Sequence, residues 1–76
     1  MNTLQKLASS NYKWARERAE AAVAIFQQYN KGNIEKEKFI SLLETLINPK
    51  ILEKDANDDH LKLELVAAIE ELYKSK

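Results

Sequence analysis

Apolar residues recur with the spacing of a helix along the first third of the chain, from Leu4 to Tyr29. Their intervals alternate between four residues and three, which at about 100° per residue keeps them on one side of a helix. This seam consists of Leu4, Ala8, Tyr12, Ala15, Ala19, Ala22, Phe26 and Tyr29. The pattern therefore predicts a helix over residues 4–29.

A second apolar stripe runs beside the seam and consists of Leu7, Trp14, Ala21 and Ile25. Together the two stripes cover roughly 200° of the helix, whereas an ordinary surface helix has an apolar face of roughly 100° or a little more. We therefore expect this helix to need neighbours on two of its sides.

The length of this helix leaves two alternatives open. A helix over 4–29 would extend for roughly 39 Å, whereas the later helices predicted below would reach only roughly 20 to 25 Å. Either the helix breaks near Ser9, Ser10 and Asn11, whose side chains compete for backbone hydrogen bonds, or its first turns project and pack on another molecule.

The rest of the chain predicts two further helices, over 35–47 and 58–74, and a short helical turn over 49–54. Gly32 can adopt the left-handed conformation that ends a helix, and Asn33 can cap the start of the next one. Pro49 suits the first position of the short turn. The predicted fold class is all-α, a small bundle of three main helices and one short turn in a single domain, residues 1–76.

Composition narrows the classes of function. The 76 residues include 12 basic and 12 acidic side chains, and this balance argues against binding to nucleic acid or an anionic membrane through bulk charge. The chain has no cysteine and one histidine, so the disulfides and zinc sites that stabilise many small domains are not expected. Because a chain this short buries only about 60% of its unfolded surface, partner subunits become a plausible source of stability.

These features also bear on location. The absence of cysteine fits a reducing cytosol, and no apolar run is long enough for a membrane span. We expect a soluble cytoplasmic protein of the kind found among bacterial or phage regulators, with no cofactor and no small-molecule substrate.

The unusual charge in the apolar arc is Arg18, one turn after Trp14. Trp and Arg are enriched among the residues that dominate binding interfaces, which favours contact with a partner. An internal role is the competing interpretation, in which Arg18 extends to water or pairs with another helix while its methylenes cover Trp14. The predicted contact set is Tyr12, Trp14, Arg18, Ala21 and Ile25, with exposed Leu63 as a minor addition. We therefore expect a non-enzymatic protein-interaction module, either a homodimer or a small adaptor, chaperone or inhibitor of a larger protein.

The alternative is a nucleic-acid-binding regulator built on a helix-turn-helix around Gly32. Its phosphate contacts would be Lys31, Lys36 and Lys38. Because Glu35 and Glu37 interrupt this group, a solvated face of mixed charge explains it more simply.

Metal binding and catalysis find little support. Asp55, Asn57 and Asp59 repeat the opening of a calcium loop, but His60 stands where the loop requires glycine and Val66 where it requires glutamate. His60 and its acidic neighbours are sequential rather than convergent, and no catalytic motif accompanies them. We predict no metal site and no enzymatic activity, with His60 exposed in the first turn of the last helix.

Overall fold

The computed structural model describes residues 2–48 and 59–74, and all regular structure within these ranges is helical. The helices are α1 (Asn2–Leu7), α2 (Lys13–Asn30), α3 (Lys36–Leu46) and α5 (Asp59–Lys74). This confirms the prediction of a small all-α bundle. The predicted turn at 49–54 lies outside the described residues, as do Asp55 and Asn57.

The helix predicted over 4–29 is divided, which corrects its boundaries and confirms the alternative of a break near Ser9, Ser10 and Asn11. Residues 8–12, here called the α1–α2 turn, separate α1 from α2. The Ser10 hydroxyl accepts a hydrogen bond from the Tyr12 backbone N–H at 3.1 Å. A serine side chain thus replaces a helical backbone acceptor at this point, and the chain turns back.

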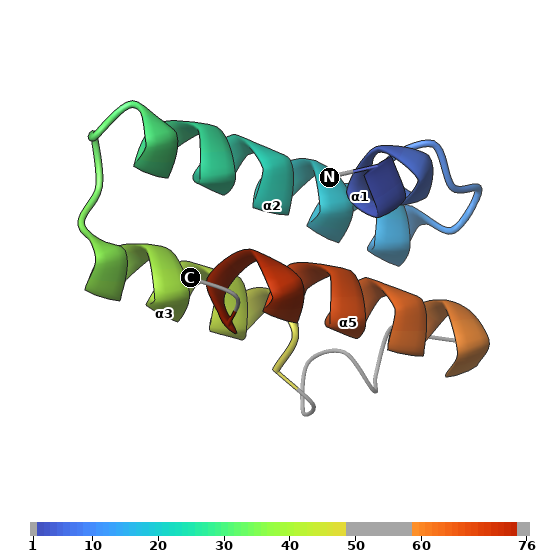
Figure 1. Ribbon diagram of the computed structural model, residues 1–76. Coiled ribbons are helices and arrows are strands. Elements are labelled where there is room, and N and C mark those ends of the chain that lie inside the picture. Colours follow the sequence, from blue (N-terminus) through green and yellow to red (C-terminus); the bar gives the residue numbers. More distant parts are fainter. Residues whose placement is uncertain (1, 49–58, 75–76) are drawn as a thin grey trace.

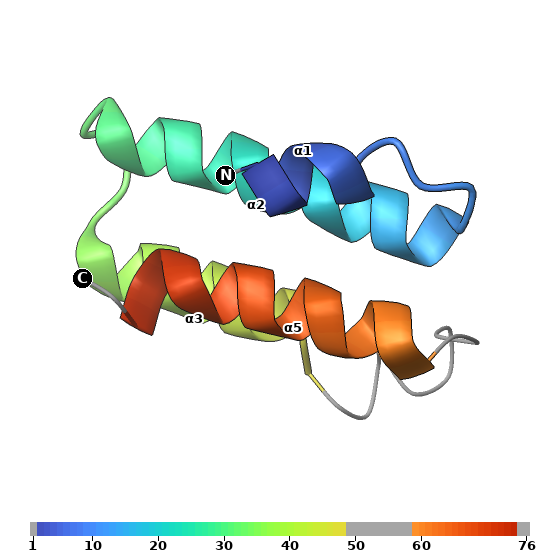
Figure 2. The same cartoon turned by 45° about the vertical axis from the view of Figure 1, so that its right-hand side comes forward.

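After this turn, α2 runs back alongside α1 (Figure 2). Helix α2 packs against α1, α3 and α5, and α5 packs against the other three. In both views α2 and α3 lie side by side and antiparallel (Figures 1 and 2). The wide apolar arc of α2 therefore has neighbours on more than one side, as expected, and all of them belong to the same chain.

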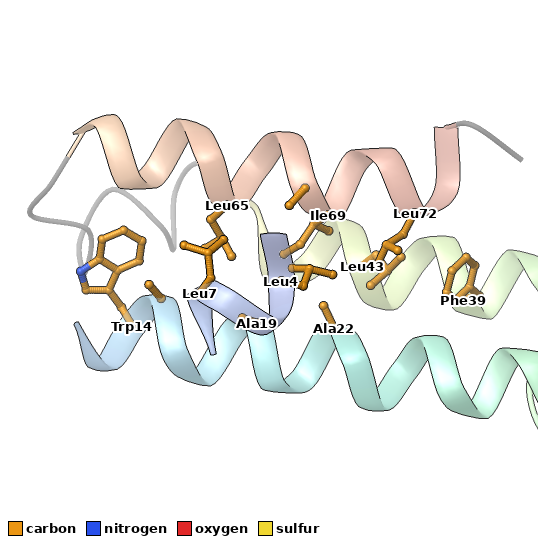
Figure 3. Packing of buried hydrophobic residues seen from close by; sticks show 12 residues of the cluster. Leu4, Leu7, Trp14, Ala19, Ala22, Phe39, Leu43, Leu65, Ile69 and Leu72 are labelled. Carbon is orange, nitrogen blue, oxygen red and sulfur yellow. The ribbon is translucent and has the colours of Figure 1, made fainter. Parts of the chain in front are cut away.

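The core lies between α2 on one side and α3 and α5 on the other, with α1 closing the gap (Figure 3). Leu4 and Leu7 of α1 point into the space between α2 and α5 and are only 1% and 2% exposed. The remaining buried side chains are Trp14, Ala15, Ala19, Ala22, Phe39, Leu43, Leu65, Ala68, Ile69 and Leu72. The small alanines of α2 allow its neighbours to approach closely.

Gly32 ends α2 as the sequence predicts, with a φ of +78°. The Asn33 and Gly32 backbone N–H groups donate to the carbonyls of Gln28 and Tyr29, both at 3.0 Å, in the Schellman arrangement. The prediction that Asn33 caps α3 is wrong, because its amide donates to the Gln28 side chain at 2.7 Å. Glu35 occupies the N-cap position and makes no side-chain cap hydrogen bond.

Aromatic rings join α2 to α3 beside this turn. Tyr29 stacks on Phe39 with ring centroids 4.2 Å apart and an interplanar angle of 11°. Phe26 approaches the same ring at 6.3 Å in a tilted arrangement. The hairpin is therefore closed by apolar packing as well as by its turn.

Helix α5 is described from Asp59 to Lys74 and ends at the predicted residue, and its buried face is the one expected. Lys74 donates to Glu70 at 2.8 Å, as the spacing of four residues predicts. Leu63 points away from the core and is 67% exposed, which confirms the prediction that it is exposed. In the described part of the chain, no helix has both the length and the apolar character needed to cross a membrane.

Candidate protein-contact surface

Trp14 belongs to the core of the single chain. Its side chain is 8% exposed and lies at the end of the bundle where α5 begins (Figure 3). Trp14 was predicted from the sequence to lie in a partner contact, but a residue this buried offers little surface to another molecule. Its position instead closes one end of the chain's own core.

Arg18 connects α2 to the end of α3. Its Nε donates to the Leu46 carbonyl at 3.2 Å, and its Nη1 donates to the Trp14 carbonyl at the same distance. Leu46 is the last residue of α3, where backbone carbonyls lack partners within the helix and a positive charge is favourable. The internal interpretation, in which Arg18 reaches another helix of the same chain, thus accounts for its place in the apolar arc.

The remaining members of the predicted contact set differ in exposure. Ala21 and Ile25 are half-buried, and Ile25 packs against the core. Tyr12 is 38% exposed, so it is the member of the set with most surface to offer. Trp14, Arg18, Ala21 and Ile25 therefore share one side of α2, whereas Tyr12 precedes the helix and is the accessible member of the set.

Tyr12 is held in place by its surroundings. Its ring lies 5.9 Å from the ring of Trp14, with the planes tilted by 42°. Its backbone N–H is bound by the Ser10 hydroxyl, and Arg16 Nη1 donates to the Ser10 carbonyl at 3.2 Å. The serines could be identified from the sequence as possible helix breakers. The contact of Arg16 with the Ser10 carbonyl could not, because it spans six residues and depends on the turn itself.

Shallow grooves flank α1 on both sides. The groove between α1 and α2 has a volume of about 340 Å³, with an apolar floor and a polar rim. It is lined by Gln5, Ala8, Glu20, Val23, Ala24 and Gln27. A groove of about 300 Å³ between α1 and α5 carries Lys6 opposite Glu64 and Glu71. Neither groove could be predicted from the sequence, because both arise from the folding back of α1.

The basic residues of the alternative function lie at the hairpin between α2 and α3. Lys31, Lys36 and Lys38 are all exposed, and so are Glu35 and Glu37 between them. The two helices run antiparallel (Figure 1), whereas a DNA-binding helix-turn-helix crosses its helices at about 90–120°. Binding to nucleic acid stays a prediction from the sequence, and no contact in the structure adds to it.

His60 lies in the first turn of α5, exposed as predicted, with its Nε2 3.3 Å from a Glu64 carboxylate oxygen. Among the residues that the structure describes, no three histidine, cysteine, aspartate or glutamate side chains come together as metal ligands. The absence of enzymatic activity and of a cofactor remains a prediction.

Two pKa values near the end of α5 depart from their usual range. Burial raises the pKa of the Tyr73 phenol, and the nearby Glu70 carboxylate raises it further. The hydrogen bond from Lys74 to Glu70, together with their attraction, raises the pKa of the Lys74 ammonium. Both groups lie at the other end of α5 from His60.

Comparisons of the chain with protein-family models, with curated proteins and with solved structures found no match.

Proposed function

We propose that this protein is a non-enzymatic protein-interaction module whose contact surface is centred on Tyr12. The observation that carries the proposal is an exposed aromatic side chain in a turn fixed by hydrogen bonds and backed by a buried ring. Tyrosine is enriched among the residues that contribute most to binding free energy. A side chain already ordered before binding also loses less conformational entropy when a partner covers it.

The residues around Tyr12 suit the edge of such a contact. Lys13, the next residue along the chain, and Glu17 are well exposed, and Lys13 Nζ lies 3.9 Å from Glu17 Oε1, so a polar ion pair follows Tyr12 on α2. Contact surfaces commonly combine a central aromatic anchor with a polar rim that excludes water. The partner would be a second copy of the chain or a larger protein that the module regulates as an adaptor, chaperone or inhibitor. We place this activity in the cytoplasm, in keeping with the absence of cysteine.

Photo-cross-linking tests this surface. Benzoylphenylalanine is incorporated in place of Tyr12, where it keeps an aromatic ring, and in a control chain in place of the exposed Glu37. Irradiation in the producing cells is expected to yield a discrete adduct from position 12, because a ring at a contact lies against its partner. The control position is also exposed and lies outside the predicted contact set, so it reports random collision.

Two results would contradict the proposal. One is the absence of any adduct from position 12 while the substituted protein is folded and abundant. The other is the same set of adducts from positions 12 and 37. Loss of the position-12 adduct on addition of excess unsubstituted protein, but not of the Tyr12→Ala variant, would show that the tyrosine itself is needed.

A further inference from the structure

We propose that α1 is exchanged between two copies of this chain, through conversion of the α1–α2 turn into helix. In the exchanged form α1 and α2 make one continuous helix, and the α1 of each copy occupies the site between α2 and α5 of the other. The inference rests on the proposed function and deepens it, because it names the partner as a second copy of the chain.

The periodicity of the sequence continues through the turn without interruption. Ala8 and Tyr12 are in phase with Leu4 before the turn and with Ala15 after it. Residues 8–12 contain no glycine or proline, and no non-glycine residue in the described part of the chain has a positive φ. These residues can therefore become helical, and Tyr12, which is exposed in the folded-back form, then falls in line with the apolar seam.

The start of α2 is poorly suited to being a helix terminus. Tyr12 is its N-cap residue and makes no side-chain cap hydrogen bond, and the first turn contains no acidic residue. Lys13 and Arg16 instead place positive charge at the positive end of the helix dipole. In a continuous helix these positions are interior, so the missing cap and the unfavourable charge no longer matter.

The site that α1 occupies can be filled equally well by the α1 of a second copy. Leu4 and Leu7 are almost completely buried between α2 and α5, and an α1 from another chain presents the same two side chains. Exchange of identical elements preserves the buried contacts and is a known route to dimers at low energetic cost.

The exchanged form also requires a second copy. A helix over 2–30 would be roughly 43 Å long. The longest dimension of the folded-back molecule is only 34 Å. In a single chain such a helix would carry Leu4 and Leu7 away from their site and into water. The continuous helix is therefore stable only when a partner receives α1.

A proline at position 13 is compatible with the folded-back form but not with the continuous helix. Position 13 is the first residue of α2, where proline is favoured, and the preceding Tyr12 has the extended backbone (ψ 117°) that proline requires. In the continuous helix the same proline is interior, removes one backbone hydrogen bond and clashes with the preceding turn. Lys13→Pro should thus keep the folded-back form and block exchange. Lys13→Ala is the matched control, since it removes the same side chain and the same contact with Glu17.

The measurement is solution mass by light scattering over a concentration series that reaches millimolar, with helix content recorded on the same samples. Wild type and Lys13→Ala are expected to approach twice the 8.8 kDa chain mass. Lys13→Pro should need about 100-fold or more protein to do so, while keeping its helix content. In a mixture of isotope-labelled and unlabelled dimeric chains, contacts of Leu4 and Leu7 with Leu65 should appear between chains.

Exchange is overturned if wild type stays monomeric throughout, or if Lys13→Pro dimerises as well as Lys13→Ala. Should Lys13→Pro fail to fold, Ser10→Ala decides, because it removes the bond to the Tyr12 N–H and favours helix. Exchange requires stronger dimerisation of Ser10→Ala than of wild type, and equal or weaker dimerisation contradicts it. A monomeric wild type that still forms the position-12 adduct with another protein would refute exchange alone, whereas a monomer without that adduct would refute the proposed function as well.

Discussion

At the scale of single residues, Trp14 closes the end of the core at which α5 begins (Figure 3). Replacement of a buried aromatic residue by alanine typically costs about 3–5 kcal/mol, which is a large part of the stability of a small domain. Trp14→Ala should lower the free energy of unfolding by about that amount in urea titrations. Leu63→Ala, at an exposed position, should change it by less than about 0.5 kcal/mol.

A small effect of Trp14→Ala on unfolding, combined with weakened association, would contradict this placement. That result would show instead that Trp14 contacts a partner, as was predicted from the sequence. The two outcomes differ in both stability and solution mass, so they can be told apart on the same samples.

Arg18 links α2 to α3, because its guanidinium donates hydrogen bonds to the Trp14 and Leu46 carbonyls. Hydrogen bonds to a charged group contribute roughly 1.5–3 kcal/mol when partly buried. Arg18→Ala is expected to lower the free energy of unfolding by about that much. Arg18→Lys keeps the charge near the end of α3 but cannot reproduce both bonds, so it should recover only part of the loss. Unchanged unfolding of Arg18→Ala would show that these bonds add nothing to stability.

Tyr73 makes stability depend on pH in the alkaline range. Its pKa in the folded chain is raised above the unfolded value of about 10, so the folded state holds a proton that the unfolded state releases. The part of the free energy of unfolding that comes from this raised pKa is fully present below about pH 10. It is lost as the pH rises through the pKa of Tyr73 in the folded chain. Unfolding measured at about pH 8 and again at about pH 11 should show a smaller loss for Tyr73→Phe than for wild type. Equal losses in the two proteins would contradict the assignment.

At the scale of elements, the two ends of α2 are built differently. The C-terminal end has a complete Schellman turn with Gly32 at positive φ, whereas the N-terminal end has an uncapped Tyr12. The hairpin at Gly32 is thus the fixed connection of the bundle. The α1–α2 turn is the connection with a helical alternative.

Substitution of Gly32 tests the fixed connection. No atom lies within 4 Å of an added Cβ, so the cost of Gly32→Ala comes from the backbone alone. Forcing a residue with a Cβ into this conformation costs roughly 1–2 kcal/mol. We expect Gly32→Ala to lower the free energy of unfolding by that amount and Gly32→Asn by less, since asparagine tolerates the left-handed region. Equal stability of wild type and Gly32→Ala would mean that the turn relaxes to another conformation.

Local signals explain which elements could be predicted from the sequence. Periodicity located the apolar faces, and Gly32 marked the hairpin because its requirement for positive φ is a local property. Asn33 was misassigned because it has two possible partners, and the Gln28 side chain proved to be the one it binds. The α1–α2 turn was left open, since Ser10 can occupy a helix or break one. Contacts such as that of Leu7 with α5 decide the matter, and no local pattern reports them.

At the scale of the whole molecule, the folding back of α1 determines how the apolar surface is used. The same arc that suggested a partner from the sequence is largely covered by α1, α3 and α5. The candidate surface accordingly shrinks from a stripe along α2 to the region around Tyr12. This also explains why Trp14, Arg18 and Ile25, although placed on one side of α2, contribute mainly to the chain's own stability.

In the monomer, α1 folds back and fills the site between α2 and α5 of its own chain. The most direct test is a set of nuclear Overhauser contacts recorded on a dilute sample whose mass is that of one 8.8 kDa chain. We expect contacts of the Leu4 and Leu7 methyl groups with Leu65 and Ile69, together with non-helical chemical shifts at residues 8–12. A monomer that lacks those contacts and shows continuous helical shifts from residue 2 to residue 30 would contradict it.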